Sequence, residues 1–153
     1  MSRPCIIMDI DGTLSNAEHR VHLLGGRTNS AIDQAPDWEA FLAAAADDTV
    51  NEEIKLLNNA MSAHVPVFIC TGRKDDQLEM TSAWLKKFGI TYNFLLMRDR
   101  RDRRPDTEIK KEMLDQIRET GFEPLFAVED RKSVTAMWRE NGVRCLQVCE
   151  GDY

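Results

Sequence analysis

The sequence predicts an α/β protein built on a Rossmann-like, doubly wound parallel sheet. Five short apolar runs alternate along the chain with segments of helical periodicity. Most of these runs are apolar on both faces, as the strands of a parallel sheet covered by helices must be. The chain has 153 residues, of which 42% are hydrophobic and 30% charged, the size and composition of one globular domain. We therefore expect a single domain over residues 1–153.

The predicted strands are the five apolar runs. They span residues 5–8, 65–70, 94–97, 125–128 and 143–148. Helices are predicted between them, where apolar residues recur every three or four positions and a polar residue can begin the helix. They start near residues 51, 75, 106 and 133 and stop near residues 63, 89, 121 and 142, three of them at a glycine.

Residues 15–50 break this alternation. They hold Gly25-Gly26, a polar run and Pro36, followed by a short predicted helix from Trp38 to about Ala46. A long insert beside a strand end is often a lid or a substrate-binding element. We expect a small cap-like insert after the first strand.

Charge and hydropathy exclude several classes of protein. The net charge of −6 excludes a nucleic-acid coat protein that binds through overall positive charge, although a local basic patch remains compatible with it. The apolar runs are far shorter than the roughly 20 residues of a membrane helix and than the core of a signal peptide. The four cysteines, Cys5, Cys70, Cys145 and Cys149, lie in apolar segments without a Cys-x-x-Cys pair. We expect buried free thiols in a cytoplasmic protein.

Polar residues follow three of the predicted strands at their carboxyl ends. They are Asp9-Ile10-Asp11-Gly12-Thr13, Thr71-Gly72-Arg73 and Glu129-Asp130-Arg131. In open α/β sheets the carboxyl ends of the strands meet at one edge, and ligands bind there. We expect these three segments to line one crevice.

The residue types in this crevice suit phosphoryl transfer at a magnesium ion. Asp9, Asp11 and Asp130 offer the oxygen ligands that hard divalent cations prefer. A carboxylate can also attack phosphorus and form an aspartyl-phosphate. Gly12 leaves room for backbone amides near phosphate oxygens, and Thr71 offers a hydroxyl. A lysine would balance the remaining charge, and either Lys110 or Lys111 is placed to supply it.

This pattern resembles the four motifs of the haloacid dehalogenase superfamily of phosphatases. Asp9-Ile10-Asp11-Gly12-Thr13-Leu14 resembles the first motif, Thr71 the second, Lys110 the third and Glu129-Asp130 the fourth. The resemblance implies that Asp9 is the nucleophile and that Asp11 is first the general acid and then the general base. It implies Mg²⁺ held by the Asp9 side chain, the Asp11 carbonyl and Asp130. It also implies the strand order 5-4-1-2-3, with the first strand central.

Much of the chain also resembles the 3′-phosphatase domain of phage polynucleotide kinases. The similar segments are residues 69–73, 97–98, 104–112, 129–131, 137–139 and 147–153, and residues 18–22 are similar to a segment of short phage and bacterial proteins. The family often has a second Asp where this chain has Glu129. No Gly-x-x-x-x-Gly-Lys-Ser/Thr loop is present, so we expect a phosphatase without a kinase domain.

Several residues keep two interpretations at this point. Arg73 either binds the substrate phosphate or braces Asp130 or Glu129. The arginines of one short segment (Arg98, Arg100, Arg101, Arg103 and Arg104) form either a self-paired charged loop or a basic rim for nucleic-acid phosphates. His19 and His22 are expected at the surface or in packing, with His19 also a candidate on the substrate side. Trp38, Trp84 and Trp138 are expected in the core.

The predicted function is Mg²⁺-dependent removal of 3′-phosphates from DNA or RNA ends. The substrate-binding candidates are Gly12, Gly72, Arg73, Arg98, Arg101 and His19. One alternative is a 5′-nucleotidase or small-metabolite phosphatase with the same catalytic residues. The other is an inactive binding module, which the complete set of Asp9, Asp11, Lys110 and Asp130 disfavours.

Overall fold

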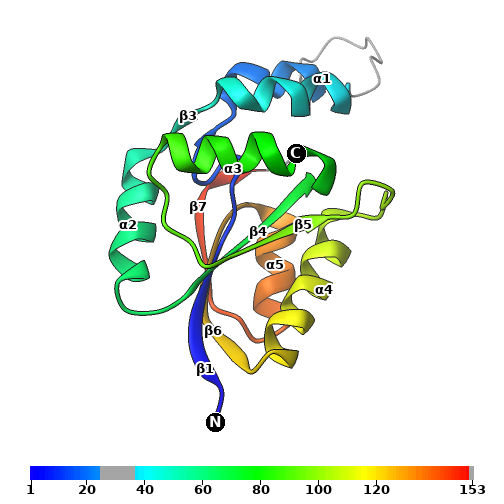
Figure 1. Cartoon of the computed structure of the whole chain (residues 1–153). Helices are drawn as coiled ribbons and strands as arrows, with labels where there is room; N and C mark the ends of the chain where they lie inside the picture. Colours follow the sequence, from blue (N-terminus) through cyan, green and yellow to red (C-terminus); the bar gives the residue numbers. More distant parts are fainter. Residues whose placement is uncertain (25–36, 152–153) are drawn as a thin grey trace.

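The computed structural model describes residues 1–24 and 37–151. Within these ranges, five strands form one parallel sheet in the order β5-β4-β1-β6-β7 (Figure 1). Their bounds are Phe94–Arg98, Val67–Lys74, Arg3–Met8, Phe122–Arg131 and Cys145–Gly151. Counted along the chain, these are the third, second, first, fourth and fifth predicted strands, so the predicted order with the first strand central is confirmed.

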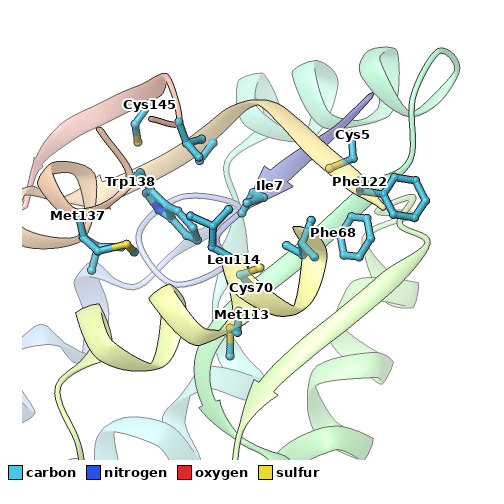
Figure 2. Close-up of a cluster of buried hydrophobic side chains, with 14 of the residues drawn as sticks. Cys5, Ile7, Phe68, Cys70, Met113, Leu114, Phe122, Met137, Trp138 and Cys145 are labelled. Atoms are coloured by element: carbon cyan, nitrogen blue, oxygen red, sulfur yellow. The ribbon is translucent and has the colours of Figure 1, made fainter. Parts of the chain in front are cut away.

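Two helical layers cover the sheet because successive residues of a strand point to opposite faces. Cys5 and Ile7 of β1 join one buried apolar cluster with α4 (Asp106–Glu119) and α5 (Lys132–Glu140). Figure 2 shows Leu114 of α4 and Trp138 of α5 gathered near Ile7 in this cluster. Ile6 and Met8 join a second cluster on the other face.

The second cluster is formed with α2 (Glu52–Ser62) and with α3 (Leu78–Lys87), which follows the short helix η3 (Asp75–Gln77). Ile54 of α2 and Trp84 and Leu85 of α3 are buried against the sheet there. None of the helices in the described part of the chain is long and apolar enough to cross a membrane.

The segment after β1 leaves the sheet and returns to it through a pair of short strands. β2 (Ser15–Asn16) pairs antiparallel with β3 (Thr49–Val50), outside the five-stranded sheet. Between them lie η1 (Glu18–Leu24), α1 (Trp38–Ala43) and η2 (Ala44–Asp47). In Figure 1, α1 lies above the carboxyl ends of the strands. The predicted Gly25-Gly26 and Pro36 lie outside the described residues, and the cap-like role of residues 15–50 stays a prediction.

Some expectations about single residues are wrong. Trp38 is not in the core, since 53% of its surface is exposed. The reason is that α1 packs against η1 and η2 of the insert and buries Phe41, not its first residue. Cys149 is exposed, whereas Cys5, Cys70 and Cys145 are buried, because Cys145 at the start of β7 packs in the apolar cluster and Cys149 lies toward the other end of this edge strand. Asn51 precedes α2 without capping it by its side chain, because its amide donates to the Thr13 carbonyl oxygen instead.

The ends of the predicted strands also differ. β4 continues from Val67 through Thr71 to Lys74, and β6 runs from Phe122 to Arg131. The predicted run 65–70 starts before β4 and covers only its first part, and the run 125–128 covers only the middle of β6. The polar residues at their carboxyl ends keep strand geometry, and this fixes the directions of the side chains in the site.

Candidate active site

The polar ends of three strands meet at the carboxyl edge of the sheet. Asp9 follows β1 and is 5% exposed, Thr71 belongs to β4, and Asp130 belongs to β6. Both of the latter are fully buried. Lys110, on the first turns of α4, points to the same place and is also buried. Together these residues form a buried group of charged and polar side chains at the carboxyl edge of the sheet.

Asp9 lies at the centre of this group. The Lys110 ammonium donates to Asp9 Oδ1 at 2.7 Å, and the Thr13 hydroxyl donates to Asp9 Oδ2 at 3.0 Å. Burial and the nearby Glu129 carboxylate raise the pKa of Asp9 to about 7, although Lys110 acts in the opposite direction. The single ammonium of Lys110 therefore does not offset the burial and the negative charge of Glu129, both of which disfavour an ionised Asp9.

Glu129 shares Lys110 with Asp9. Its Oε2 accepts from the Lys110 ammonium at 2.8 Å, and its Oε1 accepts from the backbone N–H groups of Asp130 and Arg131 at 3.1 and 3.3 Å. Burial raises the pKa of Glu129 to about 7 against the effect of Lys110. Carboxylate oxygens of Asp9, Glu129 and Asp130 all lie within 4.8 Å of one another. This arrangement can hold a hard divalent cation.

Asp11 faces a different set of partners. Arg73 donates to it from Nε at 3.0 Å and from Nη2 at 2.8 Å, and Arg20 donates to Asp11 Oδ1 from Nη2. Burial disfavours the Asp11 charge, but the guanidinium groups of Arg73 and Arg20 outweigh burial and hold the pKa of Asp11 well below its usual range. Asp11 is thus ionised in this arrangement.

The buried Asp48 connects the insert to the ion pairs around Asp11. Asp48, from the end of the insert, accepts from Arg20 Nε at 2.8 Å and from Arg20 Nη2 at 2.6 Å. Arg20 also donates to the Phe41 carbonyl oxygen at 3.1 Å and lies 4.1 Å above the Phe41 ring. The fully buried Arg20 therefore connects η1 and α1 of the insert to Asp11.

A cavity of about 600 Å³ opens above these residues and is lined by Asp9, Asp11, Arg73 and Lys110. Asp106 also lines it and pairs with Arg98 at 3.1 Å, with Arg131 at 3.4 Å and with Lys110 at 3.6 Å. Gly72 makes room for Asp106, because a Cβ atom on Gly72 would clash with Asp106 Oδ1. The cavity thus has carboxylates at its floor and cations around them.

Comparison with known proteins agrees with this geometry. A family model described as the polynucleotide kinase PNKP phosphatase domain matches residues 3–153. The chain belongs to this family. It is a phosphatase of the haloacid dehalogenase superfamily, as the resemblance of its four motifs indicates.

Solved structures give the same result. Chains from the Pnkp1/Rnl/Hen1 complex and from the Pnkp1/Rnl/Hen1 RNA repair complex are each 31% identical to this chain, with a TM-score of 0.78. The match covers 99% of this chain but 47% and 44% of those chains, so this chain spans just under half of their length. A haloacid dehalogenase-like hydrolase from Streptococcus pneumoniae is 15% identical with a TM-score of 0.65, over 95% of this chain and 84% of that one. This last similarity concerns the fold alone.

Within this family site, the residues implied as catalytic and metal-binding lie close together. The two lysines differ as helix geometry requires: Lys110 points into the site, whereas Lys111 pairs with Asp115 at 2.6 Å on the outside of α4. Thr71 Oγ1 accepts from the Arg73 N–H at 3.1 Å, which leaves its own hydroxyl hydrogen to donate. The catalytic roles of these residues stay predictions.

The predicted substrate-binding residues are more scattered. Gly72, Arg73 and Arg98 line the cavity. Gly12 has a φ of 81°, which favours glycine, but its N–H donates to the Ser15 carbonyl oxygen at 3.0 Å and serves the turn. His19 Nε2 lies 2.8 Å from Asp48 Oδ1, and its ring is not among the residues that line the cavity.

The arginine-rich segment divides into three kinds of contact. Arg101 and Arg104 pair with Asp99 and Asp102 of the same loop, as the self-paired interpretation expects. Arg98 is partly buried and donates to the Gly72 and Arg104 carbonyl oxygens. Arg103 lines the cavity.

Sequence reasoning did not select Arg20, Asp48 or Asp106 as site residues. For Asp106 a signal exists, since it lies four positions before Lys110 and thus on the same face of α4. Arg20 and Asp48 lie within the insert and outside the motifs, and only the folded chain brings them to the surroundings of Asp11.

Proposed function

We propose that this chain is a Mg²⁺-dependent polynucleotide 3′-phosphatase that works through an aspartyl-phosphate on Asp9. The observation that carries the proposal is the geometry of one cavity, in which Asp9 and Asp11 lie together with Lys110 and beside the acidic group that Asp9 forms with Glu129 and Asp130. Without a metal ion and substrate the surroundings favour a protonated Asp9 and an ionised Asp11. The proposed roles therefore require a cation beside Asp9 and a substrate phosphate beside Arg73, each of which reverses the local balance of charge.

The donor set fits a magnesium ion. Asp9, Glu129 and Asp130 offer hard oxygen ligands in one buried group, and the family resemblance adds the Asp11 carbonyl. The raised pKa values of Asp9 and Glu129 indicate a surplus of negative charge that a divalent cation would offset. Bound Mg²⁺ supplies positive charge that lets an anionic phosphate approach an anionic carboxylate.

The side chains of this chain account for the remaining steps. The Asp9 carboxylate forms a bond to phosphorus while the bond between phosphorus and the 3′-oxygen breaks. Asp11 gives a proton to that oxygen and later takes one from the water that hydrolyses the aspartyl-phosphate. Lys110 keeps Asp9 in position, and Thr71 donates its hydroxyl to a phosphate oxygen.

The sequence predicts that Arg73 either binds the substrate phosphate or braces a carboxylate, and we propose that it does both. It braces a carboxylate, but that carboxylate belongs to Asp11. A substrate phosphate offers Arg73 a second anion, which weakens its hold on Asp11. The pKa of Asp11 then rises toward the range in which it can donate a proton.

The polynucleotide substrate is supported by the cavity and by the relatives. Arg98 and Arg103 line the cavity above the carboxylates, where phosphates of a longer substrate can be bound. One 31% identical relative is part of a complex described as an RNA repair complex. We extend to this chain only the substrate class, a nucleic acid.

The test compares kcat/KM for three substrates of equal base composition: a 3′-phosphorylated oligonucleotide, a 5′-phosphorylated one and a mononucleotide. We expect the first to be preferred, its hydrolysis to stop in EDTA and Mg²⁺ to restore it. A preference for the mononucleotide or for the 5′-phosphate would favour the nucleotidase alternative. Recovery with Zn²⁺ but not with Mg²⁺ would contradict the proposed metal site.

A further inference from the structure

The cavity above Asp9 has two chemically different walls. Leu24, Trp38, Phe41 and Leu42 from η1 and α1 form an apolar wall. Lys74, Arg98, Arg103 and Arg104 form a cationic wall. Its volume of about 600 Å³ lies within the range of roughly 300–1,000 Å³ that encloses whole organic ligands. A phosphate group alone does not account for such a cavity or for its apolar wall.

Trp38 is the most exposed part of the apolar wall. It is the first residue of α1, and 53% of its surface is exposed. Its ring meets Phe41 edge-on, with centroids 5.9 Å apart and planes at 85°. Phe41 is itself buried and carries the Arg20 guanidinium over its ring. The indole is therefore supported at its edge while much of it stays accessible from the cavity.

Two cations of the opposite wall have no acidic partner within the described residues. Lys74 and Arg103 line the cavity without an ion pair to any residue in the described ranges 1–24 and 37–151. Their neighbours Arg98 and Arg104, in contrast, pair with Asp106 and Asp102. Lys74 and Arg103 are thus the cations of this wall that are available to an anionic ligand.

We infer that this cavity is a clamp for the last nucleotide of the chain end, in which Trp38 stacks on the terminal nucleobase while Lys74 and Arg103 bind the next phosphate. The inference rests on the proposed function, because it specifies how a polynucleotide end is held for attack by Asp9. An aromatic face suits any of the bases, and an unpaired cation suits any backbone phosphate. The clamp selects polynucleotide ends without selecting their sequence.

The stacking contact is tested with a ratio of specificities. For each variant, kcat/KM on a 3′-phosphorylated oligonucleotide is divided by kcat/KM on glycerol phosphate, a small ester without a base. Trp38→Ala should lower this ratio about 5- to 150-fold, the range for loss of one base–aromatic stack. Trp38→Phe should retain most of the ratio. Leu78→Ala is the matched control, since Leu78 is also the first residue of its helix and is 51% exposed.

An abasic substrate separates stacking from a general effect on the fold. If the terminal nucleotide lacks its base, wild type should lose the same factor that Trp38→Ala loses, and Trp38→Ala should lose nothing more. An equal loss by Trp38→Ala on normal and abasic oligonucleotides would overturn the stacking contact while the 3′-end preference of wild type stands. A wild type that does not prefer 3′-phosphorylated oligonucleotides over glycerol phosphate would instead overturn the proposed function itself.

The cations are tested by substrate length. Arg103→Ala and Lys74→Ala should lower kcat/KM on the oligonucleotide more than on a nucleoside 3′-monophosphate. Each should reduce the slope of log kcat/KM against log salt concentration by about 1. Arg100→Ala is the control, since Arg100 is in the same loop and does not line the cavity. Equal losses on both substrates, or an Arg100→Ala effect as large as that of Arg103→Ala, would overturn this half of the clamp.

Fluorescence gives a measurement that does not depend on turnover. Trp84 and Trp138 are only 3% and 1% exposed, so a bound base can quench Trp38 directly. Binding of a 3′-phosphorylated oligonucleotide to Asp9→Asn should quench tryptophan emission, and the additional change Trp38→Phe should remove the quenching. Quenching that persists in the double variant, or binding without any quenching, would overturn the stacking contact.

Discussion

Asp9 and Asp11 are separated by one residue, yet their surroundings shift their pKa values in opposite directions. Burial and Glu129 raise the pKa of Asp9 to about 7, whereas Arg73 and Arg20 hold the pKa of Asp11 well below its usual range. Asp9 is buried and Asp11 is partly buried, and burial raises the pKa of both groups, so burial alone does not explain why one pKa is raised and the other lowered. The neighbouring charges decide it.

The difference follows from where the neighbours come from in the chain. The Asp9 side is built by the sheet and α4, which place Glu129 and Asp130 near Asp9 together with Lys110. The Asp11 side is built by Arg73 of β4 together with Arg20 and Asp48 of the insert. The sheet and α4 therefore provide an acidic site suited to a cation, whereas the sheet and the insert together provide a group of compensated ion pairs around Asp11. Four measurements can break or sharpen this contrast.

The largest effect is expected for Asp9→Asn, which removes the proposed nucleophile. The amide cannot form an aspartyl-phosphate, so kcat should fall by on the order of 10⁴-fold or more. Asp47→Asn is a control, since Asp47 is exposed on the insert. Hydrolysis of a 3′-phosphorylated oligonucleotide at near wild-type rate by purified Asp9→Asn would exclude Asp9 as the nucleophile.

Asp11→Asn should lower kcat by about 10²- to 10⁴-fold, the range for loss of a general acid or base. The fold-decrease in the rate of the first step, in which the aspartyl-phosphate forms, should be smaller for a phosphate ester with a good leaving group. Such a leaving group needs less protonation as it departs. This is measured as the burst rate of leaving-group release for p-nitrophenyl phosphate and for the oligonucleotide. An equal loss on both substrates would argue that Asp11 acts through structure and not as the acid.

Lys110 and Lys111 offer a matched pair on the same helix. Lys110→Met leaves Asp9 and Glu129 buried without their shared ammonium, so the free energy of unfolding at pH 8 should fall by about 3–5 kcal/mol. Lys111→Met removes an outward pair with Asp115, worth about 0.3–0.5 kcal/mol. Both values come from urea unfolding in EDTA. Similar losses in the two variants would contradict the central place of Lys110.

The sheet and its carboxyl edge were predictable because their signals are local. Apolar runs indicate strands, and Asp9, Thr71 and Asp130 follow such runs directly. In a parallel sheet these strand ends must come together. The convergence of the motif residues at one edge of the sheet could therefore be expected without coordinates.

The Asp11 side could not be predicted in the same way. Arg20 and Asp48 belong to an insert whose folding depends on contacts across 28 positions of sequence, and neither residue follows a strand of the sheet. Trp38 shows the same limit, since helical spacing indicates an apolar face but not whether that face meets the core or a cavity. Local patterns predict the elements, whereas the partners of buried charges depend on tertiary packing.

The smallest effect concerns the pH dependence of stability. The ordinary pKa values are 3.8 for Asp9 and 4.5 for Glu129, and both are raised to about 7 in the fold. Between about pH 5 and 7 the native protein thus holds protons that the unfolded chain has lost. The free energy of unfolding contributed by this pair is fully present below the ordinary pKa values and is lost as the pH rises through about 7. The pKa of Asp11 is lowered, so its contribution to the free energy of unfolding changes only at pH values below this window.

Melting temperatures in EDTA should therefore fall by a few degrees between pH 5.5 and pH 8. Because Asp9 and Glu129 share Lys110, they titrate as a pair, and Glu129→Gln should flatten the fall. Asp47→Asn should leave it unchanged. Mg²⁺ should oppose the fall, because a cation prefers the deprotonated carboxylates and its binding strengthens as they lose their protons. A melting temperature in EDTA that rises from pH 5.5 to 8, or a fall that Glu129→Gln does not alter, would show that the surplus of negative charge does not lie at Asp9 and Glu129.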